Sequence, residues 1–177
     1  RNYTLNDHMT GQRLSSTSIS ADGRFVLENS YITRADGKNE WTKYIVDLQT
    51  GNRYQPYNFV QWAAKGGRYI SRTVDQNHKS IYEYRDVISG KAEHLYTHPS
   101  QEGISFVAED TKIIVRQSTE GKKELHNQVR QILEPNDRLP GWRNRSYLSV
   151  IDVKTGVRRQ ITTGLRSTGG TMSNDGK

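Results

Sequence analysis

The sequence predicts an all-β fold: a partial β-propeller of about three four-stranded antiparallel blades plus the start of a fourth. Two signals that alternate along the 177 residues predict it. The phrase Asp-x-x-Thr/Ser-Gly recurs after strand-like runs, and a short turn that opens another strand precedes each run. The phrase occupies residues 47–51, 86–90 and 152–156, and the turns occupy 21–24, 64–68, 108–112 and 173–177. Repeats of roughly 40 residues with four short strands each are typical of propeller blades.

These signals place blade 1 at about 17–56, blade 2 at about 57–98 and blade 3 at about 102–163, with the start of a fourth at about 168–177. Within blade 1, Asp36-Gly37 lies between two apolar runs, which is a strong hairpin signal. The strands expected in blade 1 are 17–20, 24–31, 41–47 and 52–55. Those expected in blades 2 and 3 are 59–62, 68–74, 80–87, 92–96, 104–107, 112–117, 147–153 and 157–162.

The repeated phrase has a local physical reason. An aspartate at the end of a strand can accept hydrogen bonds from backbone N–H groups two or three residues later. The glycine supplies the positive φ that closes the hairpin. Cation binding by the aspartate is the functional alternative, but three copies at equivalent places favour an architectural turn.

The third blade differs from the others by an insertion. About 30 residues, Ser118–Ser146, stand where the other blades have a turn of five to seven. Within it, residues 120–133 lack proline and carry apolar residues at helical spacing, so we expect a short helix that ends before Pro135. The apolar positions are Leu125, Val129, Ile132 and Leu133. Trp142 is expected to anchor the rest as an ordered loop.

Composition narrows the function classes. The net charge of +7 comes from residues scattered along strands and turns, which favours a solvated surface over a nucleic-acid interface. The absence of cysteine excludes disulfides, thiolate metal sites and a cysteine nucleophile. No apolar run is long enough to cross a membrane. His94 and His98 have a metal-like spacing on a helix but lie on a predicted strand and loop, so we expect no metal and no cofactor.

The combination of Ala21-Asp-Gly-Arg-Phe-Val26 with Tyr44-Ile-Val-Asp-Leu-Gln-Thr-Gly51 resembles the TolB-like propeller repeat. The third blade narrows the resemblance. There the stretches 138–148 and 151–156 look like the N-terminal propeller of Bacteroidetes-type peptidases of the prolyl oligopeptidase and dipeptidyl peptidase IV clan. The opening Tyr3-Thr-Leu-Asn-Asp7 resembles the segment that leads into that propeller.

That resemblance implies a secreted or periplasmic serine exopeptidase, in which the propeller gates and orients peptide substrates. The family's Ser-Asp-His triad lies on a C-terminal α/β-hydrolase domain, with the serine in Gly-x-Ser-x-Gly. No such pentapeptide occurs here, since Gly164-Leu-Arg-Ser-Thr-Gly169 has the wrong spacing. We therefore expect this chain to be non-catalytic, with a peptide and a hydrolase domain as its partners.

Dipeptidyl peptidase IV relatives hold the substrate amino terminus with an adjacent glutamate pair on a helix inserted in the propeller. Here Glu124 and Glu134 are single, which either puts a dipeptidyl specificity in doubt or places the contact with the amino terminus elsewhere. The insertion still supplies candidate contacts for a peptide or a domain, because arginines hold carboxylates by bidentate bonds. The candidate residues are Glu124, Glu134, Arg138, Trp142, Arg143 and Arg145. The alternative is a decorated surface loop.

Two other functions fit the same repeats: a stand-alone TolB-like binding propeller that acts through protein contacts, and a sugar-processing or sensory propeller. An open array of blades also leaves faces and strand edges exposed. Self-association, in its simplest form a homodimer, is therefore a further expectation.

Overall fold

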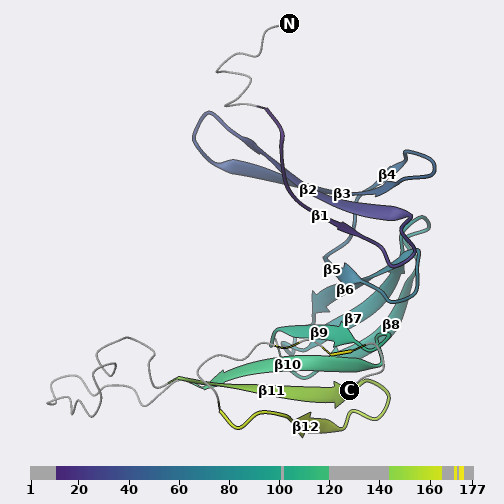
Figure 1. The fold of residues 1–177 in the computed structure, drawn as a ribbon. Coiled ribbons are helices and arrows are strands. Elements are labelled where there is room, and N and C mark those ends of the chain that lie inside the picture. Colours follow the sequence, from purple (N-terminus) through teal and green to yellow (C-terminus); the bar gives the residue numbers. More distant parts are fainter. Residues whose placement is uncertain (1–10, 101, 120–143, 165–169, 171, 174–177) are drawn as a thin grey trace, which may run out of the picture. The chain divides into compact units, whose positions relative to one another are not determined.

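The computed structural model describes residues 11–100, 102–119, 144–164, 170 and 172–173, and these form three four-stranded antiparallel sheets (Figure 1). The predicted all-β class and four-stranded blades are confirmed. Two compact units make up the chain. Residues 1–100 contain the first two sheets and residues 101–177 the third. The helix expected at 120–133 and most of the start of a fourth blade lie outside the described residues.

Blade 1 has the strand order β1-β2-β3-β4. Its central hairpin pairs nine residues on each side, from Phe25 opposite Asp47 to Thr33 opposite Asn39. Along β2, buried Phe25 and Leu27 alternate with partly exposed neighbours, as expected for a strand with one covered face. The strands are β1 (Arg13–Ile19), β2 (Phe25–Thr33), β3 (Asn39–Asp47) and β4 (Arg53–Tyr54).

The innermost strand of blade 1 begins earlier than the sequence predicts. We expected irregular chain up to residue 16, whereas β1 begins at Arg13. The added residues are Arg13, Leu14, Ser15 and Ser16, and this part of the strand pairs with β2 through a bulge between Leu14 and Ser16. Exposed polar side chains give no alternating apolar signal, so pairing with β2, and not hydrophobic burial, extends this strand.

Blade 2 repeats the same strand order with shorter inner strands. β5 has four residues where β1 has seven, and β6 and β7 have seven each where β2 and β3 have nine. The strands are β5 (Phe59–Trp62), β6 (Arg68–Val74), β7 (Ser80–Asp86) and β8 (Ala92–His98). The central hairpin of blade 1 is therefore longer than that of blade 2 by two residues on each strand.

Blade 3 carries its insertion at the end of a regular hairpin. β10 pairs with β11 without a break from Lys112 opposite Asp152 to Thr119 opposite Arg145. The insertion thus joins the second and third strands, as predicted. The strands are β9 (Ile104–Val107), β10 (Lys112–Thr119), β11 (Arg145–Asp152) and β12 (Arg158–Gln160).

A hydrophobic core lies where blades 1 and 2 face each other. One cluster of buried side chains draws members from both sheets, and partly buried aromatic residues pack against it. Its buried members are Phe25, Leu27, Ile45, Tyr69 and Val87, and the aromatic residues around it are Tyr54, Phe59 and Trp62. The Trp62 indole N–H also donates to the Ser18 hydroxyl at 3.0 Å. Each sheet thus covers the apolar face of the other.

Leu27 should be one of the residues on which this packing depends. Replacing Leu27, which is 4% exposed, with alanine should lower the free energy of unfolding by about 2–5 kcal/mol, because it leaves a cavity between the sheets. Leu48 is 57% exposed, and Leu48→Ala should change it by no more than about 0.5 kcal/mol. Urea denaturation of both variants measures the difference. Equal effects would contradict the assigned interface.

The turn that opens β10 should be strained. Ala108, Glu109 and Asp110 have φ values of 50°, 55° and 62°, a left-handed run that is costly for residues with a Cβ. Glu109 is exposed. Glu109→Gly should therefore raise the free energy of unfolding, by up to about 1 kcal/mol. Gln49→Gly, in a turn position without positive φ, should lower it. A destabilising Glu109→Gly in the same denaturation assay would refute the strain.

Candidate binding site

The repeated aspartates occupy equivalent turns, as the sequence predicts. In blade 1 the Asp47 carboxylate accepts a hydrogen bond from the Gln49 N–H at 3.0 Å. The Gly51 N–H donates to the Asp47 carbonyl at 2.8 Å, and Gly51 has a φ of 74°. The glycine is needed because other residues rarely adopt that conformation.

The same backbone turn recurs in the other two blades, because the Gly90 and Gly156 N–H groups donate to the aspartate carbonyls at 3.0 Å and 2.8 Å. There the carboxylate accepts from the N–H three residues on, whereas that of Asp47 accepts from the N–H two residues on. The Asp86 carboxylate accepts from the Ser89 N–H at 2.8 Å, and the Asp152 carboxylate accepts from the Thr155 N–H at 2.8 Å. These backbone bonds are the main reason why the pKa values of both aspartates lie below their usual range. Gly90 and Gly156 have φ values of 69° and 71°. The shared geometry supports an architectural role for the repeated phrase.

A second recurrent bond joins this turn to the turn that opens the blade's second strand. The N–H of the residue after each aspartate donates to the carbonyl of the residue directly before that strand. The pairs are Leu48 to Arg24 at 2.9 Å, Val87 to Gly67 at 3.0 Å and Val153 to Thr111 at 2.9 Å. Each blade therefore has two turns fixed to each other at one end.

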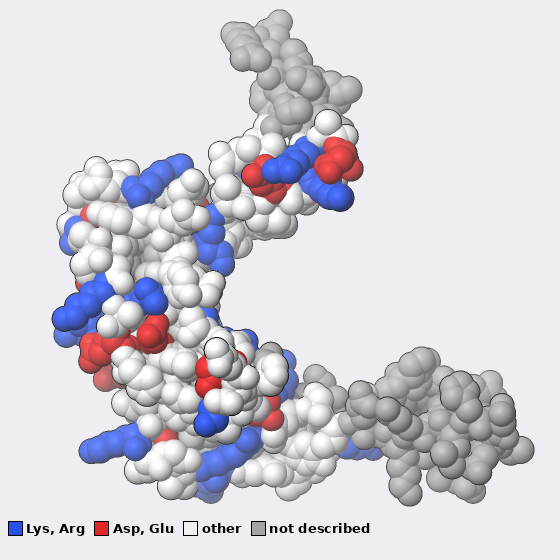
Figure 2. Space-filling view, turned by 180° about the vertical axis from the view of Figure 1, so that it is seen from behind, with Lys and Arg blue, Asp and Glu red and all other residues white. Residues whose placement is uncertain are grey.

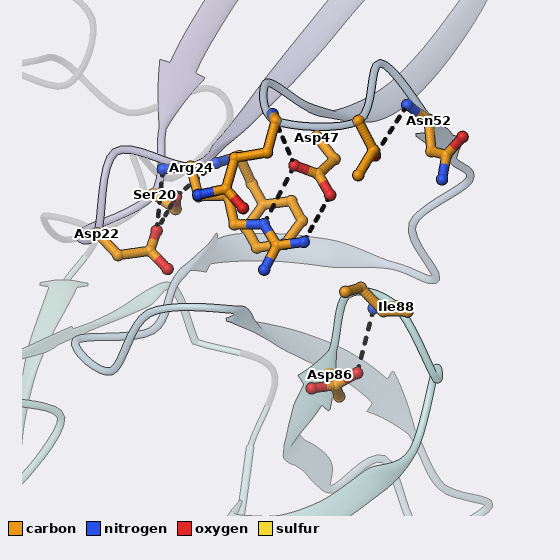
Figure 3. Close-up of polar contacts among 10 residues, drawn as sticks. Ser20, Asp22, Arg24, Asp47, Asn52, Asp86 and Ile88 are labelled. Atoms are coloured by element: carbon orange, nitrogen blue, oxygen red, sulfur yellow. Dashed lines mark hydrogen bonds and ion pairs between the residues drawn. The ribbon is translucent and has the colours of Figure 1, made fainter.

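Blade 1 adds an ion pair at this end. The Arg24 guanidinium donates from Nε and Nη2 to the two Asp47 oxygens at 3.1 Å and 2.7 Å (Figure 3). The Asp47 side chain is 1% exposed. The bidentate arginine, with the turn N–H, holds the pKa of the Asp47 carboxyl well below its usual range. The carboxylate is fully engaged within the turns, so this end of the blade is structural.

The residues predicted to contact a peptide or a domain lie almost entirely outside the described part of the chain. Glu124, Glu134, Arg138, Trp142 and Arg143 belong to that group. Arg145 is described: it is the first residue of β11, opposite Thr119, where the insertion leaves the sheet. Its guanidinium donates to the Asn144 carbonyl at 3.0 Å. Contacts of these residues with a peptide or a domain stay a prediction.

A groove on blade 1 is a candidate site that the sequence reasoning missed. It has a volume of about 480 Å³ and is lined by Ser15, Ser16, Asn29, Trp41, Thr42 and Lys43. Trp41 is 59% exposed, and its ring lies 4.8 Å from the Tyr31 ring at a tilt of 41°. The Asn29 amide donates to the Ser16 hydroxyl at 3.0 Å. The groove thus combines an exposed aromatic surface with hydroxyl and amide groups and one ammonium.

One signal in the sequence could have found this groove. Side chains two apart on a strand share a face, so Trp41 and Lys43 on β3 lie beside Asn29 and Tyr31 on β2. Their positions within the hairpin were predictable from the Asp36-Gly37 turn. The groove itself was not, because its lining also depends on how β1 pairs with β2 through the bulge between Leu14 and Ser16.

The described residues give little support for other kinds of site. Among them, no group of histidine, aspartate or glutamate side chains is placed to hold a metal ion. In the same residues, no helix is long and apolar enough to span a membrane. On the face in Figure 2, Lys and Arg are distributed over the described surface with Asp and Glu among them, which is unlike a basic nucleic-acid stripe.

Comparison with known proteins supports the fold. No protein-family model and no curated protein matches the sequence. Acylaminoacyl peptidase from Pyrococcus horikoshii, in its orthorhombic crystal form, is similar in structure, with a TM-score of 0.50 and 12% identity over 85% of this chain and 25% of its own. An acylaminoacyl peptidase in complex with Z-Gly-Gly-Phe-chloromethyl ketone has a TM-score of 0.52 and 12% identity over 84% of this chain and 25% of its own.

The chain therefore spans about a quarter of the length of these peptidases. At such low identity the similarity shows a common fold, in agreement with the partial β-propeller formed by the three sheets.

The Arg24–Asp47 pair predicts a pH-dependent stability. The pKa of Asp47 is lower in the folded chain than its ordinary value of 3.8, so ionised Asp47 stabilises the fold above that pH. This stabilisation is lost as the pH falls through 3.8 towards the folded pKa. Asp47→Asn should lower the Tm at neutral pH, and the difference from the wild type should narrow below about pH 4.

The control for this prediction is Asp152→Asn, which changes an equivalent turn whose carboxylate is held by Thr155. It should lower the Tm by less than Asp47→Asn does at neutral pH. Thermal denaturation across a pH series measures both. A Tm difference for Asp47→Asn that is independent of pH would show that the ion pair does not stabilise the fold.

Proposed function

We propose that this chain is the non-catalytic β-propeller portion of a serine peptidase of the prolyl oligopeptidase clan. The observation that carries the proposal is the structural similarity to acylaminoacyl peptidases over 84–85% of the chain. The resemblance of residues 138–148 and 151–156 to peptidase propellers points the same way.

In this proposal the propeller gates and orients peptides for a C-terminal α/β-hydrolase domain that carries the nucleophile. The hairpin of β10 and β11 supports a role for the insertion, because it is a regular ladder from which Ser118–Ser146 could reach a second domain. A periplasmic or secreted location and a homodimer belong to the same proposal. The resemblance to Bacteroidetes-type peptidases belongs to this proposal as well.

The alternative is a TolB-like propeller that binds a partner without an attached enzyme. The groove beside Trp41 favours this alternative, since it offers a binding surface within blade 1 itself. The two functions differ in one chemical property of the full-length protein. A peptidase has a reactive serine, whereas a binding propeller has none.

A fluorophosphonate probe tests that difference. The full-length protein should be labelled covalently and should cleave a chromogenic acyl-peptide or prolyl-peptide substrate, because a clan peptidase has an activated serine in its hydrolase domain. The 177-residue chain alone should do neither, since it lacks Gly-x-Ser-x-Gly.

Two results would contradict the proposal. A full-length protein that is folded but neither labelled nor active would favour the binding propeller. Hydrolysis by the 177-residue chain alone would mean that its own residues are catalytic. Mass spectrometry of the labelled peptide supplies the control, because the modified serine must lie outside the sequence of this chain.

A further inference from the structure

The groove is formed by β1, β2 and β3 of blade 1, whose central strands are longer than those of blade 2. The central hairpin of blade 1 has nine residues per strand and that of blade 2 has seven. Two residues of strand extend about 7 Å. Phe59, the first residue of β5, marks the limit of the overlap, and the Lys43 ammonium lies 6.0 Å from its ring. Beyond Lys43, the Tyr31–Trp41 pair has no such neighbour from β5 in the described structure.

The uncovered surface has the chemistry of a binding site for part of a polar chain. Trp41 presents a large exposed ring whose orientation is supported by Tyr31. Aromatic rings of this kind give contact area at a low entropic cost, because few torsions need to be ordered. The Asn29 amide N–H donates to the Ser16 hydroxyl oxygen, and this bond holds both side chains in place. The Ser16 O–H and the Asn29 amide oxygen are not used in it. Both can face a ligand's amide groups.

The lining of the groove is positively charged. Lys43 is the charged residue among those that line it. Asp47 lies on the same face at the other end of the hairpin. Its charge is balanced there by Arg24, which donates to both carboxylate oxygens. Glu28 and Glu40 alternate onto the opposite face of the sheet. A ligand that complements the groove therefore carries a negative charge.

We propose that this groove binds an acidic peptide segment, with a carboxylate at Lys43 and an adjacent apolar side chain on the Trp41 ring. The choice of a peptide as the acidic ligand rests on the proposed function. The acidic and apolar character of the ligand does not rest on that function. It follows from the ammonium, the hydroxyls and the aromatic ring of the groove.

The test uses NMR titration of the chain with three probes: the blocked tripeptide Asp-Phe-Asp, the blocked tripeptide Lys-Phe-Lys, and trigalacturonate. Asp-Phe-Asp should shift the Trp41 indole N–H signal and bind with a Kd on the order of 1 mM or below. Lys-Phe-Lys should bind at least about fivefold more weakly. Added salt should weaken the binding of the acidic peptide, because the groove is open to solvent.

Matched variants separate the groove from the general charge of the chain. Lys43→Glu should weaken Asp-Phe-Asp binding by about fivefold. Lys65→Glu makes the same change of charge at an exposed lysine in blade 2 and should have less than about a twofold effect. Trp41→Ala should weaken binding by about three- to tenfold, and Trp41→Phe should restore part of it.

Three outcomes would overturn the inference. One is the absence of binding by Asp-Phe-Asp while the chain is folded. Another is equal weakening by Lys43→Glu and Lys65→Glu. The third is binding of trigalacturonate in preference to the peptide, which would assign the groove to an acidic sugar. Failure of the peptidase proposal is a separate result, because it is read from the reactive serine and not from the groove.

Discussion

The rest of the structure depends on the bond that joins two turns at one end of each blade. The N–H groups of Leu48, Val87 and Val153 donate across to the turn that opens the blade's second strand. This bond sets the register of the blade's central hairpin, because it lies next to the first pair of opposite residues in that hairpin. A slip of one residue would move every side chain of a strand to the opposite face. Fixing the two turns therefore decides which side chains form the core.

In blades 1 and 2, that register brings two apolar faces together. Phe25, Leu27 and Ile45 from one sheet pack with Tyr69 and Val87 from the other. At the turn end the two blades approach so closely that a Cβ on Gly66 would collide with the Asp22 side chain. A glycine is required there for a steric reason. At the other end of the hairpin, the same register that builds the core leaves Trp41 and Lys43 on an exposed surface.

Much of this fold could be predicted from the sequence, because its signals are local. The Asp and Gly of each repeated phrase lie within five residues, and the structure gives them one backbone geometry in three blades. The left-handed run at 108–110 was predicted as a turn, but its positive φ values were not, because it contains no glycine. The serine-rich start of β1 was missed since it has no apolar alternation.

The parts that could not be predicted depend on residues far apart in the chain. Arg24 and Asp47 are 23 residues apart and meet only once the turns are joined. The groove is lined by residues of three strands, and the bulged pairing of β1 with β2 that completes it follows from no motif. The insertion was located correctly between the second and third strands of blade 3, where β10 and β11 form its base. Its helix and its proposed contacts stay predictions.

Amide hydrogen exchange of the folded chain tests most directly whether the joined turns hold each blade. The amides of Leu48, Val87 and Val153 lie in turns, yet each is bonded across to a second turn. They should exchange as slowly as amides in the centres of the strands they follow. Exchange of all three at the rate of an unstructured peptide, while the strands remain protected, would show that the turns are not fixed to each other and that the register has another origin.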